Sequence, residues 1–442
     1  MKSVLKFSLR VFFRRIEIAG AKEIPRDEAV IFVLNHPNGL VDPLFVLCLV
    51  PRSVSFLAKS TLFKTPVIGA VLRVVDALPV YRQQDAGANM TRNRETFAAC
   101  YERLRAGGSI GLFPEGVSHS DTKLRPLKTG AARIALGARA NSEREIKIVP
   151  LGLYYTAKAS FRSEVLLYCG ESFSVPRVAL EDDGEPPRVA VVELSERIAQ
   201  ALRDVTVNAE TREALALVAR AGRIFSTPST DHDADAMLTR EMQLRRRFVE
   251  GYGYYRVHAP ARLEAIERRV ARFEKYANLL NMDDESLVAT PSRREVMPRL
   301  FNRALLSLLL APFAFIGAFA HYPAYRLTRL LSNLFARKSE DVVSTYKIIA
   351  AMLLLPLTWT IYTLVIGLNY GWRLGLCALL ILPACGYIAV LWQERYGRFI
   401  SDARIVMNAT TRRRSLERLI AEREAIRADI VQLGDEAGLS VE

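Results

Sequence analysis

Short apolar runs alternate with longer amphipathic stretches from Glu17 to about residue 205. The short runs predict buried strands, and the stretches with helical periodicity predict helices packed on them. The expected strands cover residues 29–34, 54–58, 77–81, 109–113, 146–153 and 165–168. The expected helices cover residues 43–50, 61–74, 88–105, 127–139 and 189–203. This alternation predicts an α/β domain over 17–205, with a mostly parallel sheet flanked by helices.

The pattern changes after residue 205. A polar, acidic linker at 226–235 leads into a charged helical stretch at 236–282, so residues 206–300 are interpreted as a helical insert. His232 stands between two aspartates in the linker, which suggests either a metal ligand or a solvated linker. The composition of the linker favours the solvated form.

Three apolar segments follow within residues 301–393, at 304–320, 348–368 and 374–392. The second and third are near the length that crosses a bilayer, and the short link at 369–373 predicts a transmembrane hairpin. Basic residues flank both ends of the hairpin, so both ends and the α/β domain are expected on the cytoplasmic face. If 304–320 crossed fully, it would separate the basic stretch 326–347 from that domain. We therefore expect 304–320 to be re-entrant or interfacial.

Both ends of the chain predict amphipathic helices. Residues 1–16 interleave Lys and Arg with Leu, Phe and Ile, which is typical of a helix lying on an anionic membrane surface. The alternative is an ordinary surface helix of the domain. In the C-terminal segment 394–442, apolar residues recur among many charges between 412 and 433. That helix either packs on the insert or pairs two protomers in a homodimer.

Composition narrows the class of partner. Of 442 residues, 50% are hydrophobic, which favours a membrane portion, and the formal net charge is +14. The charge suits anionic lipid or a phosphorylated substrate. Aromatic residues are not interleaved with the basic ones as a nucleic-acid motif requires, so no nucleic acid is expected. The five cysteines form no CxxC pair and are interpreted as reduced thiols, with no metal site and no cofactor.

The first candidate for chemistry is VIFVLNHPNGLVDP at 30–43. His36 follows a predicted strand, and Asp42 precedes Pro43 as a helix N-cap would. Both belong to one edge of a strand–turn–helix unit, where the side chains can meet. An imidazole oriented by a carboxylate can take a proton from a hydroxyl group. The alternative is that Asp42 only caps its helix and His36 is a turn residue.

The second candidate is GLFPEGVSHSDTKLRPLKTG at 111–130. A strand ends at Phe113, and the turn with Glu115 and Gly116 lets the backbone approach a ligand. Glu115 would accept hydrogen bonds from substrate hydroxyls or contact the first stretch. Lys123, Arg125 and Lys128 lie before or just inside a helix predicted from near Leu127, and cations at a helix N-terminus suit phosphate. The alternatives are a simple strand-end turn and a solvated basic face.

These two stretches resemble motifs of the glycerolipid O-acyltransferase superfamily, which acylates glycerol-3-phosphate or 1-acylglycerol-3-phosphate. NHPNGLVDP is similar to the first motif and FPEG to the third. Five residues separate His36 from Asp42, and Ser118-His119 follows FPEG. Both features resemble the fungal-type glycerol-3-phosphate/dihydroxyacetone-phosphate acyltransferase branch. LPVYR at 78–82 and IVPLG at 148–152 resemble the second and fourth motifs.

The resemblance implies a role for each matched residue. His36 would be the general base and Asp42 would orient it. Substrate binding falls to the loop and strand-end residues Asn38, Arg82, Glu115, Gly116, Arg125 and Lys128, with Arg82, Arg125 and Lys128 on the phosphate. Val149 and Pro150 would shape the acyl channel. His119 has no assigned partner and is expected to have a loop role.

The expected protein is a membrane-bound O-acyltransferase of phospholipid synthesis. It would transfer a fatty acyl group from acyl-CoA or acyl carrier protein to glycerol-3-phosphate, and the alternative acceptor is lysophosphatidate or another lysophospholipid. An alternative of another class is a non-catalytic lipid-binding scaffold. The intact His36, Asp42 and Glu115 argue against a scaffold, which would not require them.

Overall fold

The computed structural model describes residues 2–81, 92–225, 236–280, 282, 293–336, 340–411 and 413–439. The chain divides into two compact units. The sheet unit comprises Met1–Glu210, Leu238–Met242 and Lys338–Thr345. The helical unit comprises Thr211–Met237, Gln243–Arg337 and Tyr346–Glu442. The predicted linker at 226–235, with His232, lies outside the described residues, as does Arg82.

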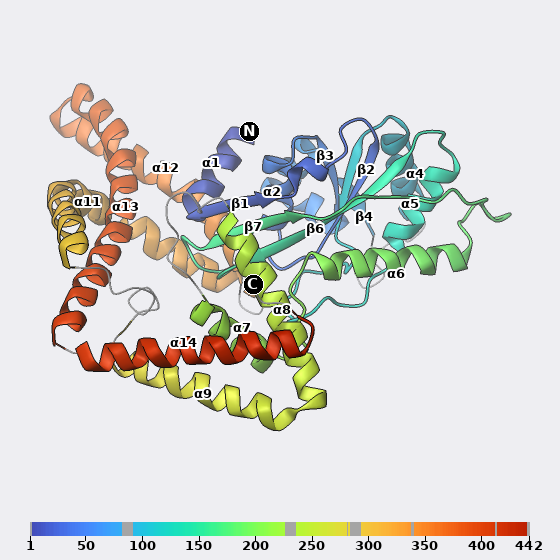
Figure 1. Cartoon of the computed structure of the whole chain (residues 1–442). Coiled ribbons are helices and arrows are strands. Elements are labelled where there is room, and N and C mark those ends of the chain that lie inside the picture. Colours follow the sequence, from blue (N-terminus) through green and yellow to red (C-terminus); the bar gives the residue numbers. More distant parts are fainter. Residues whose placement is uncertain are drawn as a thin grey trace. The chain divides into compact units, whose positions relative to one another are not determined.

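The sheet unit is built on an eight-stranded sheet (Figure 1). Its strands are β1 (Arg15–Ala19), β2 (Ala29–Leu34), β3 (Val54–Lys59), β4 (Leu78–Val80), β5 (Ser109–Leu112), β6 (Ile146–Tyr155), β7 (Glu164–Cys169) and β8 (Phe173–Ser174). The order is β1-β7-β6-β2-β5-β3-β4, and β8 pairs with β6. All pairs are parallel except those of β6 with β7 and β8. The predicted mostly parallel sheet is confirmed, whereas β1 and β8 were not predicted.

Helices cover the sheet because its central strand is apolar throughout. All six residues of β2 are buried, and Ala29, Ile31 and Val33 join a core with α4, α5 and α6. The helices of this unit are α1 (Lys2–Phe12), α2 (Val41–Leu49), α3 (Pro66–Val74), α4 (Arg92–Arg105), α5 (Gly130–Ala140) and α6 (Arg188–Asp204), with short 3-10 turns η1 (Ala21–Glu23) and η2 (Ser60–Lys64). The helix predicted over 61–74 is therefore divided, because Pro66 starts a separate helix after η2.

The N-terminal helix α1 is shorter than predicted. It ends at Phe12, and the strand β1 begins at Arg15. Leu9 and Phe12 are buried against the sheet unit, whereas Val4 and Phe7 are exposed. Part of the apolar face is thus used inside the unit, as the alternative of an ordinary surface helix requires. The exposed part remains available to a membrane surface.

The insert and the C-terminal segment form a helical cluster. It consists of α7 (Arg212–Phe225), α8 (Met237–His258), α9 (Pro260–Leu279) and α14 (Arg413–Glu436). Leu416, Leu419 and Ile426 of α14 pack with Val270 and Phe273 of α9, and the two helices lie side by side in Figure 1. For α14, intramolecular packing on the insert is therefore confirmed as one use of its apolar face.

In the part of the chain that the structure describes, three helices are long and apolar enough to cross a membrane: α11 (Arg293–Phe335), α12 (Val343–Tyr370) and α13 (Trp372–Thr411). Gly371 alone separates α12 from α13, as a hairpin requires. α13 continues well beyond residue 393, where the membrane region was predicted to end. α11 is assigned as one helix that contains Pro298, Pro312 and Pro323, where a separate short apolar segment was predicted.

Candidate active site

The loop after β2 begins with Asn35, which extends the pairing of β2 with β6. Its side-chain amide donates to the carbonyl of Leu153 at 3.0 Å and accepts from the Leu153 N–H at 2.8 Å. This imitates one more step of the backbone ladder beyond Leu34, the last paired residue of β2. The position of His36 is therefore fixed by the sheet itself.

His36 and Asp42 meet, as their positions in the sequence predict. Nδ1 of His36 lies 2.9 Å from Oδ2 of Asp42, which is fully buried. Asp42 is not the N-cap, contrary to prediction. The cap is Leu40 and α2 starts at Val41, so Asp42 lies in the first turn. Its Oδ2 accepts from the N–H of Asn38 at 2.7 Å, and Oδ1 accepts from the Tyr155 hydroxyl at 2.6 Å.

The remaining surroundings of His36 fix the face of its ring. The imidazole stacks on Phe113 with ring centroids 3.8 Å apart and an interplanar angle of 12°. Because Asp42 accepts hydrogen bonds, Nδ1 carries a proton and Nε2 has a free lone pair in the neutral ring. The described residues offer no hydrogen bond to Nε2, and 17% of the side chain is exposed. Nε2 is thus the atom that can accept a proton from a bound molecule.

The turn with Glu115 and Gly116 lies directly against the His36 loop. Glu115 is 3% exposed, and Oε1 accepts from the backbone N–H of His36 at 3.2 Å. Its Oε2 accepts from the N–H of Arg125 at 2.9 Å and contacts Nε2 of His119. The N–H of His119 donates to the carbonyl of His36 at 3.1 Å. Of the two uses predicted for Glu115, contact with the first stretch is confirmed.

His119 has a partner that the sequence did not reveal. Its Nδ1 accepts from the N–H of Asp121 at 3.2 Å, so Nε2 carries the proton in the neutral ring and donates to Glu115. His119 therefore ties the loop at 118–121 to the Glu115 turn. Its ring belongs to the framework around His36, which agrees with the expected loop role.

The predicted cations line the approach to α5. Lys128 is exposed, and its aliphatic chain lies over Gly116, whose φ is 77°. The helix α5 begins at Gly130, later than predicted, because the N–H of Lys128 donates to the carbonyl of Pro114 and keeps this segment in a loop. Arg125 is also exposed and donates to Asp121 at 2.6 Å, which raises the pKa of the guanidinium. Arg82 cannot be placed with them, since it lies outside the described residues.

Val149 and Pro150 lie within β6, where both are buried and pair with Phe32 and Val33 of β2. Among the predicted substrate-binding residues, Asn38 is fully buried beside the His36–Asp42 pair, and its side-chain amide donates to the carbonyl of Lys158 at 3.3 Å. The predicted roles in an acyl channel and in substrate binding stay predictions.

Three contacts of this site had no signal in the local sequence pattern. Two of them are the contact of Tyr155 with Asp42 and that of Phe113 with His36. The third is made by Lys158, whose Nζ donates to the carbonyl of Pro37 and to Oγ of Ser120, both at 2.7 Å, and so bridges the two loops. Lys158 follows β6, and no spacing relates it to the His36 loop. Only its position after a strand of the same sheet could have suggested that it reaches this edge.

The turn that precedes α12 and the first residues of α12 also contact the loops of the site. The 3-10 turn η4 (Glu340–Val342) and the residues up to Thr345 are part of the sheet unit. Asp341 is bonded to the hydroxyl of Ser118, and Ser344 donates to the carbonyl of Lys158. Gly39, with φ 38°, faces this segment so closely that a Cβ would lie 2.9 Å from the carbonyl oxygen of Asp341.

Comparison with known proteins places this geometry in a family. Residues 15–154 match the Acyltransferase family model, and residues 218–441 match the model of the glycerol-3-phosphate acyltransferase 2 C-terminal domain. The second match covers half of the chain. The chain therefore belongs to the family of proteins that carry the glycerol-3-phosphate acyltransferase 2 C-terminal domain. The Acyltransferase match contains His36, Asp42 and Glu115.

Curated relatives agree with the family. Glycerol-3-phosphate O-acyltransferase 1 of Saccharomyces cerevisiae is 25% identical over 80% of this chain and 59% of its own length. Glycerol-3-phosphate O-acyltransferase 2 of the same yeast is 26% identical over 62% of this chain and 38% of its own. The chain thus spans less than two thirds of the length of either relative. A crystal structure of the acyltransferase PlsC from Thermotoga maritima aligns with a TM-score of 0.34 and 21% identity, over 46% of this chain and 77% of that one.

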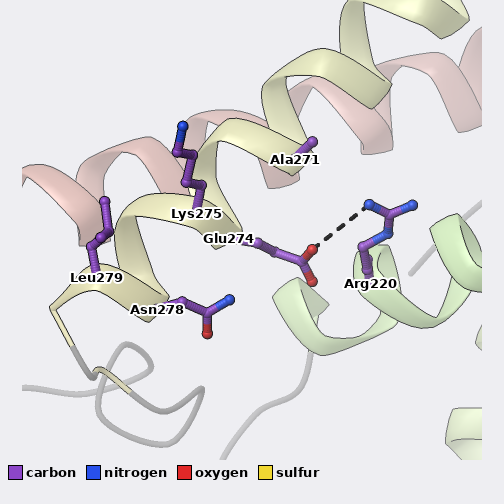
Figure 2. Close-up of a pocket in the computed structure, with 6 residues that line it drawn as sticks. All are labelled: Arg220, Ala271, Glu274, Lys275, Asn278 and Leu279. Carbon is purple, nitrogen blue, oxygen red and sulfur yellow. Dashed lines mark ion pairs between the residues drawn. The ribbon is translucent and has the colours of Figure 1, made fainter.

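A separate surface hollow of about 490 Å³ lies in the helical unit, between α7 and α9. Figure 2 shows Arg220 reaching toward Glu274 across it, with the two charges 3.8 Å apart. The other lining residues are Ala271, Lys275, Asn278 and Leu279. None of the predicted site residues that the structure describes lines it, so it is not a candidate for the acyl-transfer chemistry.

Proposed function

We propose that this protein is a membrane-bound O-acyltransferase that transfers a fatty acyl group to the hydroxyl of glycerol-3-phosphate. The observation that carries the proposal is the His36–Asp42 pair, in which Nδ1 is bound to a buried carboxylate and Nε2 is left to accept a proton. An imidazole held in this way is a general base. The family of the chain and the names of its yeast relatives support the same reaction class.

The reaction follows from the protonation state of His36. Nε2 removes the proton of the acceptor hydroxyl while the oxygen attacks the carbonyl carbon of an acyl thioester, the donor being acyl-CoA or acyl carrier protein. A new C–O bond forms, the C–S bond breaks, and the thiolate takes the proton from the imidazolium. Asp42 stabilises that imidazolium and keeps Nδ1 protonated. The products are an ester and a thiol, and no redox partner is needed.

The phosphate of the acceptor would be held by cations beside the loops. Lys128 over Gly116 and the exposed Arg125 support this assignment, and Arg82 is assigned by resemblance alone. Asn38, Glu115 and Gly116 would shape the acceptor site. Glu115 would act by holding the His36 loop, because its two oxygens already accept bonds from backbone N–H groups. Val149 and Pro150 would contribute to the wall of the acyl channel.

The course of the chain through the membrane is constrained by two sets of contacts. Asp341 bonds to Ser118, so the link between α11 and α12 stays on the side of the sheet unit. Arg269 of α9 donates to Glu422 of α14 at 2.6 Å. Because α11 follows α9 and α14 follows α13 along the chain, the start of α11 and the end of α13 would lie on the same side of the membrane. In the described residues, α7, α8 and α9 are not candidate spans. α12 and α13 would then cross as a hairpin, and α11 would enter and return without crossing.

Contacts of α11 support the proposal that this helix returns to the side of the membrane from which it enters. Its N-terminal half follows α13, where the carbonyl of Ser307 accepts from the indole of Trp392. Its C-terminal end instead meets the start of α12, where Phe335 stacks on Tyr346 with ring centroids 5.7 Å apart. Pro312 and Pro323 lie between these contacts, and proline is the usual cause of a helix bend. We place the sheet unit on the cytoplasmic face, where the exposed, basic side of α1 would contact anionic lipid.

The test is acyl transfer by the purified full chain in vesicles that contain anionic lipid. Radiolabelled acyl-CoA is offered with glycerol-3-phosphate, dihydroxyacetone phosphate or lysophosphatidate. The proposal expects labelled ester with glycerol-3-phosphate as the preferred acceptor. Transfer only to lysophosphatidate would overturn the acceptor assignment. Vesicle binding without transfer to any acceptor, with either acyl-CoA or acyl carrier protein as donor, would overturn the enzymatic function.

A further inference from the structure

Tyr155 holds the face of the Asp42 carboxylate that points away from His36. The hydroxyl of Tyr155 lies 2.6 Å from Oδ1, while Oδ2 accepts from Nδ1 of His36 at 2.9 Å and from the N–H of Asn38 at 2.7 Å. One carboxylate that is closed to solvent thus receives three donors. Tyr155 is the only one of the three that engages Oδ1 among the described residues.

The direction of this hydrogen bond is fixed. Desolvation by burial, together with the adjacent charge of Asp42, raises the pKa of Tyr155 well above its ordinary value, so the phenol keeps its proton and donates it. The ring packs against Phe13 and Phe45, with centroids 5.9 Å and 6.0 Å away. An apolar wall therefore holds the phenol in place.

We propose that Tyr155 is a positioning residue for the His36–Asp42 pair, an inference that rests on the proposed acyl transfer. The terminal torsion of an aspartate is broad, so a carboxylate held through one oxygen only can rotate. With Oδ1 bonded to the phenol, Oδ2 stays aligned with Nδ1 of His36. The phenol also withdraws charge from the carboxylate, which limits how strongly Asp42 stabilises the imidazolium.

Other charged groups face the same loop and set the background for this effect. Glu115 accepts from the N–H of His36, and His119 lies on Glu115. Lys158 donates to the carbonyl of Pro37, and the Asp341 backbone lies against Gly39. None of these contacts involves the Tyr155 hydroxyl. Besides Asp42, that hydroxyl interacts with the side-chain amide of Asn38, so its removal directly affects Asp42 and Asn38.

The test compares Tyr155→Phe with Tyr154→Phe in the full chain. Tyr154 is the preceding residue of β6, and its hydroxyl donates to a different carboxylate, Glu241, at 3.0 Å. Both variants lose one hydroxyl and keep the ring. The readouts are kcat, KM for each substrate and the pH profile of kcat, with a thermal unfolding scan of each variant.

The expected result is a kcat about 10- to 100-fold lower for Tyr155→Phe, the loss that a hydrogen bond to a charged group represents. KM should stay close to that of the parent, because the Tyr155 hydroxyl is bonded to Asp42 and is assigned no contact with substrate. The acid limb of the kcat profile should move to higher pH, since Asp42 with more charge stabilises imidazolium better. Tyr154→Phe should keep the parent kcat and profile.

Two results separate this inference from the proposed function. If His36→Ala is inactive while Tyr155→Phe keeps the parent kcat and pH profile, the positioning role is wrong and the proposed reaction stands. If His36→Ala is as active as the parent, the proposed reaction itself fails. A lower kcat for Tyr155→Phe, together with an unshifted pH profile and an unfolding temperature below that of the parent, would mark a purely structural role and overturn the inference.

Discussion

The carboxylate of Glu115 accepts a hydrogen bond from the backbone N–H of His36 at 3.2 Å, across 79 residues of sequence. The same carboxylate accepts from the N–H of Arg125 and contacts His119. One buried side chain therefore ties the loop that carries the proposed base to the loop that carries the proposed phosphate ligands. Its contribution to activity would come from holding these loops together.

Glu115→Gln tests that connection. The amide nitrogen of the substituted side chain would face the backbone N–H of either His36 or Arg125. Leaving a buried donor unsatisfied costs about 1–3 kcal/mol. We expect a lower free energy of unfolding and a kcat reduced at least tenfold. Glu143→Gln is the matched control, because Glu143 pairs with Arg177 at an exposed site. Equal activity and stability of the two variants would contradict the role given to Glu115.

Gly39→Ala tests the fit between the His36 loop and the segment at Glu340–Val342. The added Cβ would lie 2.9 Å from the carbonyl oxygen of Asp341, at a residue with φ 38°. Gly184→Ala is the control, since Gly184 has φ 80° and nothing within 4 Å of the Cβ position. The control should lose about 1–2 kcal/mol of stability from the backbone conformation alone. Gly39→Ala should lose more and also lower kcat, whereas similar unfolding temperatures would show that the segment does not press on Gly39.

Cysteine labelling tests the proposed return of α11. Asn333 is an exposed residue near the C-terminal end of α11, and Tyr370 is an exposed residue at the hairpin tip. In sealed vesicles, an impermeant maleimide should reach Asn333→Cys only from the side of the sheet unit and Tyr370→Cys only from the other side. Cys48 and Cys377 are replaced beforehand to lower the background. Labelling of both positions from one side would mean that the proposed course is wrong.

The buried thiols should resist alkylation in the folded protein. Burial raises the pKa of Cys100 and that of Cys169 to about 12, so almost no reactive thiolate exists at pH 8. Iodoacetamide at pH 8 should leave both residues unmodified until guanidinium unfolds the chain, as mass spectrometry of peptides would report. Rapid modification of either residue without denaturant would contradict the burial of these side chains.

Local signals in the sequence were enough for strands β2 to β7 and for the central pair, but not for β1 and β8. The apolar run of β2 and the turn residues after it predict a strand end that presents His36, and Asp42 is near because it is only six residues away. The parallel order of the strands then brings the Glu115 turn to the same edge. These features depend on short-range periodicity and on a general property of parallel sheets.

Contacts across long sequence distances were not predictable. Tyr155 reaches Asp42 across 113 residues, and nothing in the residues around either one encodes that pairing. The N-cap assignment of Asp42 was wrong for a different, local reason. Its carboxylate is bonded to His36 and to the N–H of Asn38, and the helix starts at Val41, two residues earlier than the Asp-Pro pattern predicts.

The central claim is that the His36 imidazole accepts the proton of the acceptor hydroxyl. His36→Ala, assayed in vesicles with radiolabelled acyl-CoA and glycerol-3-phosphate, measures this most directly. The account predicts a kcat lower by a factor of about 100 to 10,000, the range for loss of a general base, with an unfolding temperature near that of the parent. A variant that transfers the acyl group at the parent rate would contradict it.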